Sequence, residues 1–250
     1  MALIARDIEF GYDKKIPILH GVSIQAEPGQ MISLIGPNGS GKTTFIKCLN
    51  RIHRASGGTL TLDGKDLFSC KRESLAKKIG YVPQSLGNMM GGTVLDVIII
   101  GRRQYITWKI TEEDIGKALE ILRQLGIEHL ANQSYQELSG GQKQQVLIAR
   151  ALAQDTDIYL FDEPTSYLDI RNQLEVMKIA RHLVEDLGRT VIMVVHDLNM
   201  AMRYSDRVVL MQNGRIFASG TPKEVLSEDN IWEVYGIRVE IIKEKYISPC

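Results

Sequence analysis

A glycine-rich segment of eight residues, Gly36 to Thr43, constrains this chain more than any other feature. It reads Gly-Pro-Asn-Gly-Ser-Gly-Lys-Thr and fits the pattern G-x-x-x-x-G-K-[ST] at every position. A short apolar run, Met31 to Ile35, precedes the segment, and a helical pattern from Lys42 to Ile52 follows it. Strand, glycine loop and helix in this order predict the opening unit of an α/β nucleotide-binding fold.

The chemistry of this loop suits phosphate. Its glycines let several backbone N–H groups point inward, and the helix that follows adds its positive end. Lys42 supplies a mobile cation for β- and γ-phosphates, and the Thr43 hydroxyl can ligate Mg²⁺. The alternative, a glycine-rich turn that binds nothing, does not explain the strand and helix on either side. The candidate nucleotide-binding residues here are Gly36, Pro37, Asn38, Gly39, Ser40, Gly41, Lys42, Thr43 and Thr44.

Length and composition indicate one large domain spanning residues 1–250. Apolar residues make up 44% and charged residues 24% of the 250 positions, which is enough to build a core without disulfide staples. Lys plus Arg number 30 and Asp plus Glu also number 30, so overall charge gives no reason to expect nucleic-acid binding. No run is long and apolar enough to span a bilayer, and the first residues lack a secretion signal. We therefore expect a soluble, intracellular protein.

The remaining pattern predicts a mostly parallel sheet. Apolar runs at Ile158–Phe161 and Val191–Val195 resemble buried strands, with a helix from roughly Arg171 to Asp186 between them. Half-exposed strands are expected at Leu3–Tyr12 and Val22–Ala26. Asp63-Gly64 and Asn213-Gly214, which follow strand patterns at 59–62 and 208–211, are hairpin signals. Between the strands, residues of about 93–153 show helical periodicity and predict an inserted helical lobe.

Two adjacent carboxylates follow one of the buried strands. Asp162 is carried to the end of the Ile158–Phe161 strand, where it can hold the water shell of Mg²⁺. Glu163 is then placed to polarise a water molecule for attack on a γ-phosphate. A solvated turn is the alternative, and it would be preferred if the glycine loop were absent.

A third motif, Leu138 to Gln142, begins a predicted helix that runs through Ala153. Ser139 and Gln142 form a capping-box pattern, which is a sufficient structural explanation for both residues. Gly140 and Gly141 are harder to explain in this way, because each glycine weakens a helix by about 1 kcal/mol. Bare backbone N–H groups at a helix start bind anions, so this turn is a second candidate phosphate contact.

With these elements in this order, the chain resembles the ATP-binding-cassette (ABC) ATPases over essentially its whole length. The matching elements, in chain order, are an adenine-stacking aromatic at Tyr12, the Walker A loop at 36–43, the Q-loop glutamine Gln84, the signature loop at 138–142, the Walker B strand at 158–163, the D-loop at 166–169 and the switch histidine His196. The resemblance implies an α/β P-loop NTPase fold with a mostly parallel core sheet, an N-terminal antiparallel β subdomain and an inserted helical lobe.

The resemblance also implies a head-to-tail homodimer that sandwiches two ATP molecules with Mg²⁺. Ser139, Gly140, Gly141 and Gln142 would then bind nucleotide, with Ser139 and Gly141 contacting the γ-phosphate held by the opposite subunit, and Asp169 crossing the interface. Glu163, His196 and Gln84 form the implied catalytic set. Thr43, Gln84 and Asp162 form the implied Mg²⁺ contacts, in part through water.

Single residues in this set have structural alternatives. Tyr12 could be a strand-end aromatic that packs on the sheet, and a lone histidine after a strand, such as His196, is as often structural as catalytic. The order of the family's elements favours the functional interpretation of both. The remaining histidines match no motif and are interpreted as surface or packing residues: His20, His53, His129 and His182.

Within the family, the free-standing cassette and the sequence at 85–90, 93–97 and 101–105 resemble the ATPase subunits of importers for iron-siderophore complexes, haem and vitamin B12. This implies two transmembrane permease subunits, a substrate-binding protein reached indirectly, and a location at the cytoplasmic face of the membrane. We expect no nucleic-acid partner. A non-transport ABC ATPase acting on nucleic acid or ribosomes is the alternative, and a nucleotide-binding regulator with an idle Glu163 is a weaker one.

Overall fold

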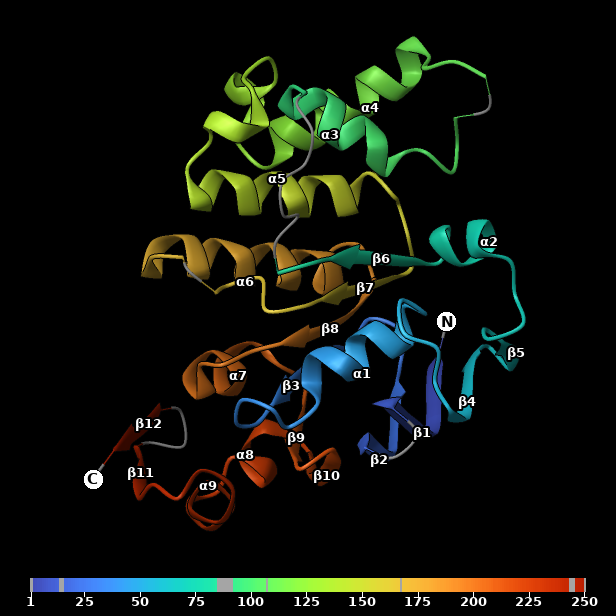
Figure 1. Ribbon diagram of the computed structural model, residues 1–250. Coiled ribbons are helices and arrows are strands. Elements are labelled where there is room, and N and C mark those ends of the chain that lie inside the picture. Colours follow the sequence, from blue (N-terminus) through green and yellow to red (C-terminus); the bar gives the residue numbers. More distant parts are fainter. Residues whose placement is uncertain are drawn as a thin grey trace.

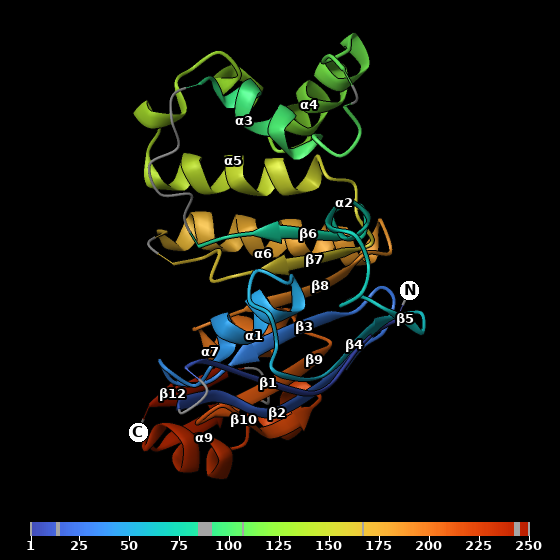
Figure 2. The ribbon, with the colours of Figure 1, turned by 45° about the vertical axis from the view of Figure 1, so that its right-hand side comes forward.

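The computed structural model describes residues 2–13, 16–84, 92–106, 108–166, 168–242 and 246–249. These form stacked layers, with a helical lobe above a central sheet and an antiparallel sheet below it (Figures 1 and 2). The prediction of an α/β fold with a mostly parallel core sheet is confirmed. No helix among these residues is both long and apolar enough to cross a membrane.

The central sheet has six strands in the order β10-β9-β3-β8-β7-β6. They are β3 (Met31–Ile35), β6 (Ile79–Val82), β7 (Ile158–Phe161), β8 (Thr190–Val194), β9 (Arg207–Gln212) and β10 (Arg215–Gly220). All adjacent pairs are parallel except β9 and β10. Every residue of β3, β7 and β8 is buried, as expected for parallel strands covered on both faces.

Two hydrophobic clusters fill the two faces of this sheet. Ile32 and Leu34 of β3 pack with helix α1 (Lys42–Leu49) and the antiparallel sheet, whereas Met31 and Ile35 pack with the long helix α6 (Ile170–Glu185). Helix α1 ends at Leu49, three residues earlier than predicted. Its end is explained by Arg51, whose φ of 55° lies in the left-handed region that interrupts a helix.

The antiparallel sheet has the order β2-β1-β4-β5. Its strands are β1 (Leu3–Asp13), β2 (Ile16–Ala26), β4 (Gly57–Leu62) and β5 (Lys65–Asp66). Strand β2 begins six residues before the predicted start at Val22. Both predicted hairpin turns are confirmed, because Asp63-Gly64 and Asn213-Gly214 have positive φ at each residue and join paired strands.

The chain between β6 and β7 holds the helices of the upper layer in Figure 1. They are α3 (Val94–Gly101), α4 (Glu112–Gln124) and α5 (Gly140–Leu152), with 3₁₀ turns at Glu128–Leu130 and Tyr135–Glu137. Arg102 and Asp114 form a buried ion pair at 2.8 Å that ties the end of α3 to the start of α4. Helix α2 (Arg72–Ala76) lies outside this layer, before β6.

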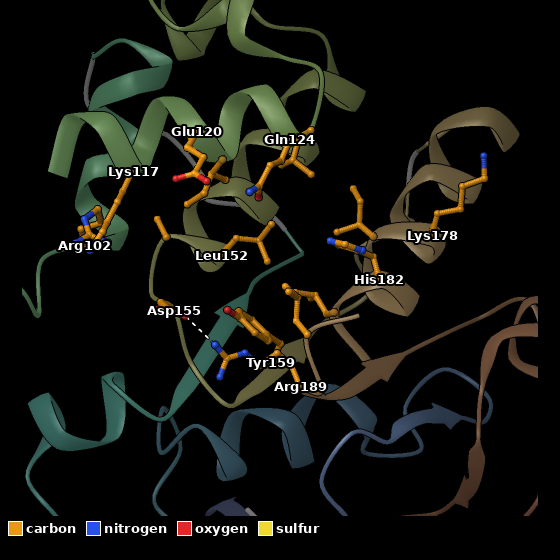
Figure 3. A pocket seen from close by; sticks show the side chains of 16 residues that line it. Arg102, Lys117, Glu120, Gln124, Leu152, Asp155, Tyr159, Lys178, His182 and Arg189 are labelled. Atoms are coloured by element: carbon orange, nitrogen blue, oxygen red, sulfur yellow. Dashed lines mark hydrogen bonds and ion pairs between the residues drawn. The ribbon is translucent and has the colours of Figure 1, made fainter. Parts of the chain in front are cut away.

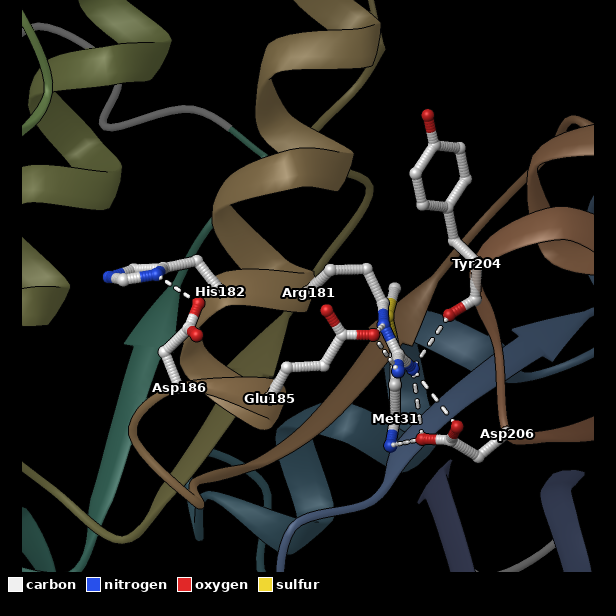
Figure 4. A network of polar contacts seen from close by, with 7 residues as sticks. All are labelled: Met31, Arg181, His182, Glu185, Asp186, Tyr204 and Asp206. Atoms are coloured by element: carbon white, nitrogen blue, oxygen red, sulfur yellow. Dashed lines mark hydrogen bonds and ion pairs between the residues drawn. The ribbon is translucent and has the colours of Figure 1, made fainter.

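Helix α6 is bordered by a cavity on one side and by a network of polar contacts on the other. A cavity of about 510 Å³ separates α4 and the end of α5 from α6, with Tyr159 and Arg189 at its floor (Figure 3). Tyr159 lies near the start of β7 and Arg189 directly precedes β8, so the cavity lies at the amino edge of the sheet. On the other side of α6, Arg181 bonds Asp206 and the Tyr204 carbonyl, and Asp206 accepts the Met31 N–H at 2.7 Å (Figure 4).

The C-terminal part completes the fold beside the sheet. Helices α7 (Leu198–Tyr204), α8 (Pro222–Val225) and α9 (Glu228–Tyr235) are followed by a hairpin of β11 (Val239–Ile242) and β12 (Tyr246–Pro249). The side chain of Asn199 accepts the N–H of Ile247 at 2.7 Å and donates to its carbonyl. The hairpin is therefore anchored to α7, the helix that begins two residues after His196.

Candidate active site

The glycine loop connects β3 to α1 at the carboxyl edge of the sheet. Its backbone requires glycine at Gly36 and Gly41, whose φ values are 141° and 100°. A Cβ at Gly36 would overlap the backbone oxygen of Met211, and one at Gly41 would lie 2.9 Å from the Leu19 side chain. A cavity of about 290 Å³ lies beside the loop. It is lined by loop residues, which include Asn38 and Gly39, and by Thr44 and Glu163.

Lys42, the first residue of α1, folds back over this loop. Its ammonium donates to the carbonyls of Gly36 at 2.8 Å and Pro37 at 2.9 Å. Burial lowers the pKa of Lys42, while the nearby carboxylates of Glu163 and Asp162 oppose that shift. The cation is therefore already held at the loop, beside the cavity that Lys42 helps to line.

Thr43 and Asp162 meet directly across the site. The Thr43 hydroxyl donates to Asp162 Oδ1 at 2.7 Å, and the Tyr81 hydroxyl donates to Asp162 Oδ2 at 3.1 Å. Burial, and then the charge of Asp162, raises the pKa of Tyr81. Two oxygens converging from α1 and β7 make a donor set that suits Mg²⁺, which prefers a few protein oxygens together with water and phosphate. These residues therefore fit the metal.

Three side chains at the carboxyl edge of the sheet contact the carboxylate of Glu163. Gln84 Nε2 donates to Glu163 Oε2 at 2.9 Å, and Ser166 Oγ donates to the same oxygen at 3.1 Å. His196 Nε2 lies 2.9 Å from it as well. All three groups approach Oε2, which leaves Oε1 with no bonded partner among the described residues. Glu163 itself has a φ of 52°, an uncommon conformation for a side chain of this size.

The motif at 138–142 forms the start of α5, away from this cluster. Ser139 caps the helix: its hydroxyl accepts the Gln142 N–H at 3.3 Å, and the Gln142 side chain accepts the Ser139 N–H at 2.9 Å. Gly140 is exposed and Gly141 is half-buried. In both ribbon views β6 and β7 run between α5 and α1, so this turn does not reach the glycine loop of its own chain (Figures 1 and 2).

Asp169 lies beside that turn as the N-cap of α6. It accepts the backbone N–H of Asn172 at 2.8 Å and the Asn172 side-chain amide at 3.0 Å. The amide nitrogen of Asn172 in turn lies 2.9 Å from the position that a Cβ of Gly141 would occupy. Asp169, Asn172 and Gly141 therefore form one contact chain that joins the starts of α6 and α5. Tyr167 of the same loop and the segment 85–91 lie outside the described residues.

Tyr12 lies near the end of β1 with 72% of its surface exposed. Most of this side chain is therefore open to solvent. Its ring contacts Phe10 edge-on, with centroids 5.1 Å apart, and its hydroxyl is 3.2 Å from His53 Nε2. Tyr81 and His53 were not assigned to the site from the sequence, and Ser166 was named only as the first residue of the D-loop. Neither Tyr81 nor His53 belongs to a sequence motif, and each contacts a residue far away in the sequence.

Fold and site together define a P-loop nucleotide hydrolase with a glycine loop, a strand-end Asp-Glu pair and a capped glycine turn on a separate helical lobe. The ABC transporter family profile matches residues 19–166. The chain belongs to this family, whose members couple ATP hydrolysis to transport.

Relatives of nearly the same length support the assignment. An ABC transporter ATP-binding protein of Methanocaldococcus jannaschii is 42% identical over 95% of this chain and 92% of its own. The petrobactin import ATP-binding protein FpuC of Bacillus anthracis is 38% identical over 90% of this chain and 84% of its own. The ferric enterobactin transport ATP-binding protein FepC of Escherichia coli K12 is 34% identical over 97% and 90%.

Solved structures give the same result. A dimeric bacterial ABC transporter cassette superposes with a TM-score of 0.79 at 30% identity, covering 88% of this chain and 98% of the other. An ATP-binding cassette in its ADP conformation superposes with a TM-score of 0.83, also at 30% identity, covering 94% and 98%. The recognition of the ABC family from sequence motifs is thereby confirmed.

Proposed function

We propose that this chain is the ATP-hydrolysing subunit of an importer for an iron-siderophore or a chemically similar chelate, a class that includes haem and corrinoids. The cargo class rests on the names of the relatives, which include petrobactin and ferric enterobactin transport proteins. The observation that carries the hydrolytic role is the convergence of Gln84, Ser166 and His196 on one oxygen of Glu163.

In this proposal the glycine loop binds the triphosphate. Backbone N–H groups of 36–43 and the Lys42 ammonium hold the β- and γ-phosphates, each charge-assisted hydrogen bond contributing roughly 1.5–3 kcal/mol. Thr43 and Asp162, with Gln84 through water, would hold Mg²⁺, which neutralises developing charge on the phosphate oxygens. Tyr12 stacks on adenine and contributes about 1–3 kcal/mol of affinity.

Glu163 is then the general base. With Oε2 fixed by three partners, Oε1 is the oxygen that accepts the proton of the attacking water. His196 holds this carboxylate and reaches toward the γ-phosphate from the end of β8. Fixing the base before the reaction is useful, because a carboxylate that must reorient loses part of its catalytic advantage.

The signature turn acts in a second copy of the chain. Because α5 lies across β6 and β7 from α1, the backbone N–H groups after Ser139 would bind a nucleotide held by a second copy of the chain and not one held by their own. Shifting such a dimer from 1:99 to 99:1 closed takes about 5.5 kcal/mol of differential binding. Two or three charge-assisted bonds at each of two γ-phosphates supply this amount. Hydrolysis removes them, and the dimer then opens.

We further propose that two permease subunits contact the sequence segment 85–105 and hold the chain at the cytoplasmic face of the membrane. A binding protein would deliver cargo to the permease. The test is to solubilise native membranes, recover this chain by affinity and identify the copurifying proteins. A polytopic subunit together with a chelate-binding protein is expected. Recovery with ribosomes or nucleic acid, without a membrane subunit, would refute the importer proposal.

A further inference from the structure

His53 and Tyr12 meet near the end of β1, although 41 positions separate them in the sequence. The His53 ring is stacked on Phe10, with ring centroids 4.7 Å apart and planes 15° apart. Tyr12 stands at 85° to the His53 ring with centroids 5.3 Å apart, and its hydroxyl is 3.2 Å from His53 Nε2. Phe10 is only 7% exposed, so this cluster has a fixed base in the core.

The polar contact matters because Tyr12 is otherwise loosely held. With 72% of its surface exposed, Tyr12 gains little orientation from packing, and its ring contacts are edge contacts to Phe10 and His53. Immobilising one exposed side chain typically costs a binding free energy that corresponds to a two- to tenfold weaker affinity. A partner that fixes the ring before the nucleotide arrives removes that cost.

His53 also links this ring to the phosphate loop. Its backbone N–H donates to the carbonyl of Lys47 in the last turn of α1, at 3.1 Å. The same helix begins at Lys42, the residue whose ammonium is held over the glycine loop. The cation for the phosphates therefore begins α1, and the partner of Tyr12 is hydrogen-bonded to the last turn of the same helix.

We propose that His53 is a positioning residue for the nucleotide base: it fixes the Tyr12 ring in the orientation in which adenine stacks on it. This rests on the proposed function, since it assumes ATP in the glycine loop with its base toward Tyr12. His53 makes no contact with phosphate, and its removal weakens recognition of the base alone.

The test compares two ligands, Mg-ATP and Mg-tripolyphosphate, which has the phosphates without the base. In His53→Phe the ring that stacks on Phe10 is kept and the hydrogen bond to Tyr12 is lost. We expect the dissociation constant for ATP to rise about two- to tenfold, with the constant for tripolyphosphate unchanged. The KM for ATP rises in parallel, with kcat unchanged. His53→Gln, which keeps a polar group near the Tyr12 hydroxyl, restores part of the affinity.

A double-mutant cycle shows whether the effect passes through Tyr12. In a Tyr12→Ala background, His53→Phe is expected to cause no further loss of ATP affinity. Equal losses for ATP and tripolyphosphate, or an undiminished effect of His53→Phe in that background, would overturn the proposal. If the unsubstituted chain binds neither ligand, or binds both independently of Lys42, the proposed nucleotide site itself is wrong.

Discussion

A substitution at Gly140 should change two properties in opposite directions: the stability of one subunit and the ATP-driven formation of a dimer. It lies in the first turn of α5, is exposed, and a Cβ there would meet no heavy atom within 4 Å. Its φ is not among the positive values, so alanine is sterically allowed. Nothing within the described subunit therefore requires glycine, although glycine weakens a helix by up to about 1 kcal/mol relative to alanine.

Gly140→Ala should accordingly stabilise the isolated subunit by up to about 1 kcal/mol, a rise of roughly 2–4 °C in Tm for a chain of this size. It should also weaken ATP-driven dimerisation, because a methyl group at this turn obstructs N–H contacts to the partner's γ-phosphate. Losing one such contact, at roughly 1.5–3 kcal/mol, lowers the association constant about tenfold or more.

A matched control is available in Gly116 on α4, which is also helical and exposed, and where an added Cβ would likewise meet no heavy atom within 4 Å. Gly116→Ala should raise Tm similarly and leave dimerisation intact. The two variants are compared by thermal unfolding without nucleotide and by sedimentation with Mg-ATP. If Gly140→Ala dimerises as well as Gly116→Ala, the signature turn does not contact a partner's nucleotide.

The remaining predictions concern single side chains. Lys42→Ala should lose most ATP affinity because the phosphate charge is left unmet, and unchanged binding in equilibrium dialysis would contradict the role of the loop. Ser139→Arg should spare ATP binding and prevent dimer closure, which light scattering with Mg-ATP would report. Burial raises the pKa of the Cys48 thiol to about 12, so Cys48 should resist alkylation at pH 8 in the folded chain and react after unfolding. Because the unfolded thiol ionises at lower pH than the folded one, the same shift predicts stability that falls as pH rises above about 9. Rapid alkylation of native Cys48, detected by mass spectrometry, would contradict this.

The sequence predicted those parts of the fold that depend on local pattern. The glycine loop, the strand at 158–161 and both Asx-Gly turns are encoded within a few residues, and each has the expected form. The early start of β2 was missed because its first residues, from Ile16, pair with the partner strand through several register shifts that obscure a simple alternation. That irregularity is visible only once the two strands are paired.

For the candidate site, the sequence indicates a set of residues but not their geometry. Sequence motifs placed Gln84, Glu163 and His196 in one set, but the shared oxygen Oε2 depends on three loops converging from β6, β7 and β8. The contacts of Tyr81 with Asp162 and of His53 with Tyr12 join positions 81 and 41 residues apart, and neither Tyr81 nor His53 belongs to a motif. Long-range packing of this kind leaves no local signature.

The most direct test of the account is the mass of Glu163→Gln in solution with and without Mg-ATP. Glutamine can keep its oxygen toward Gln84, Ser166 and His196 while presenting no base to water, so turnover should fall by roughly 10²–10⁴-fold. ATP should then persist and hold two subunits together. Light scattering should give twice the 28.1 kDa of one chain with Mg-ATP and a single chain without it. A variant that binds ATP and remains monomeric, or that hydrolyses ATP near the rate of the unsubstituted chain, would contradict the account.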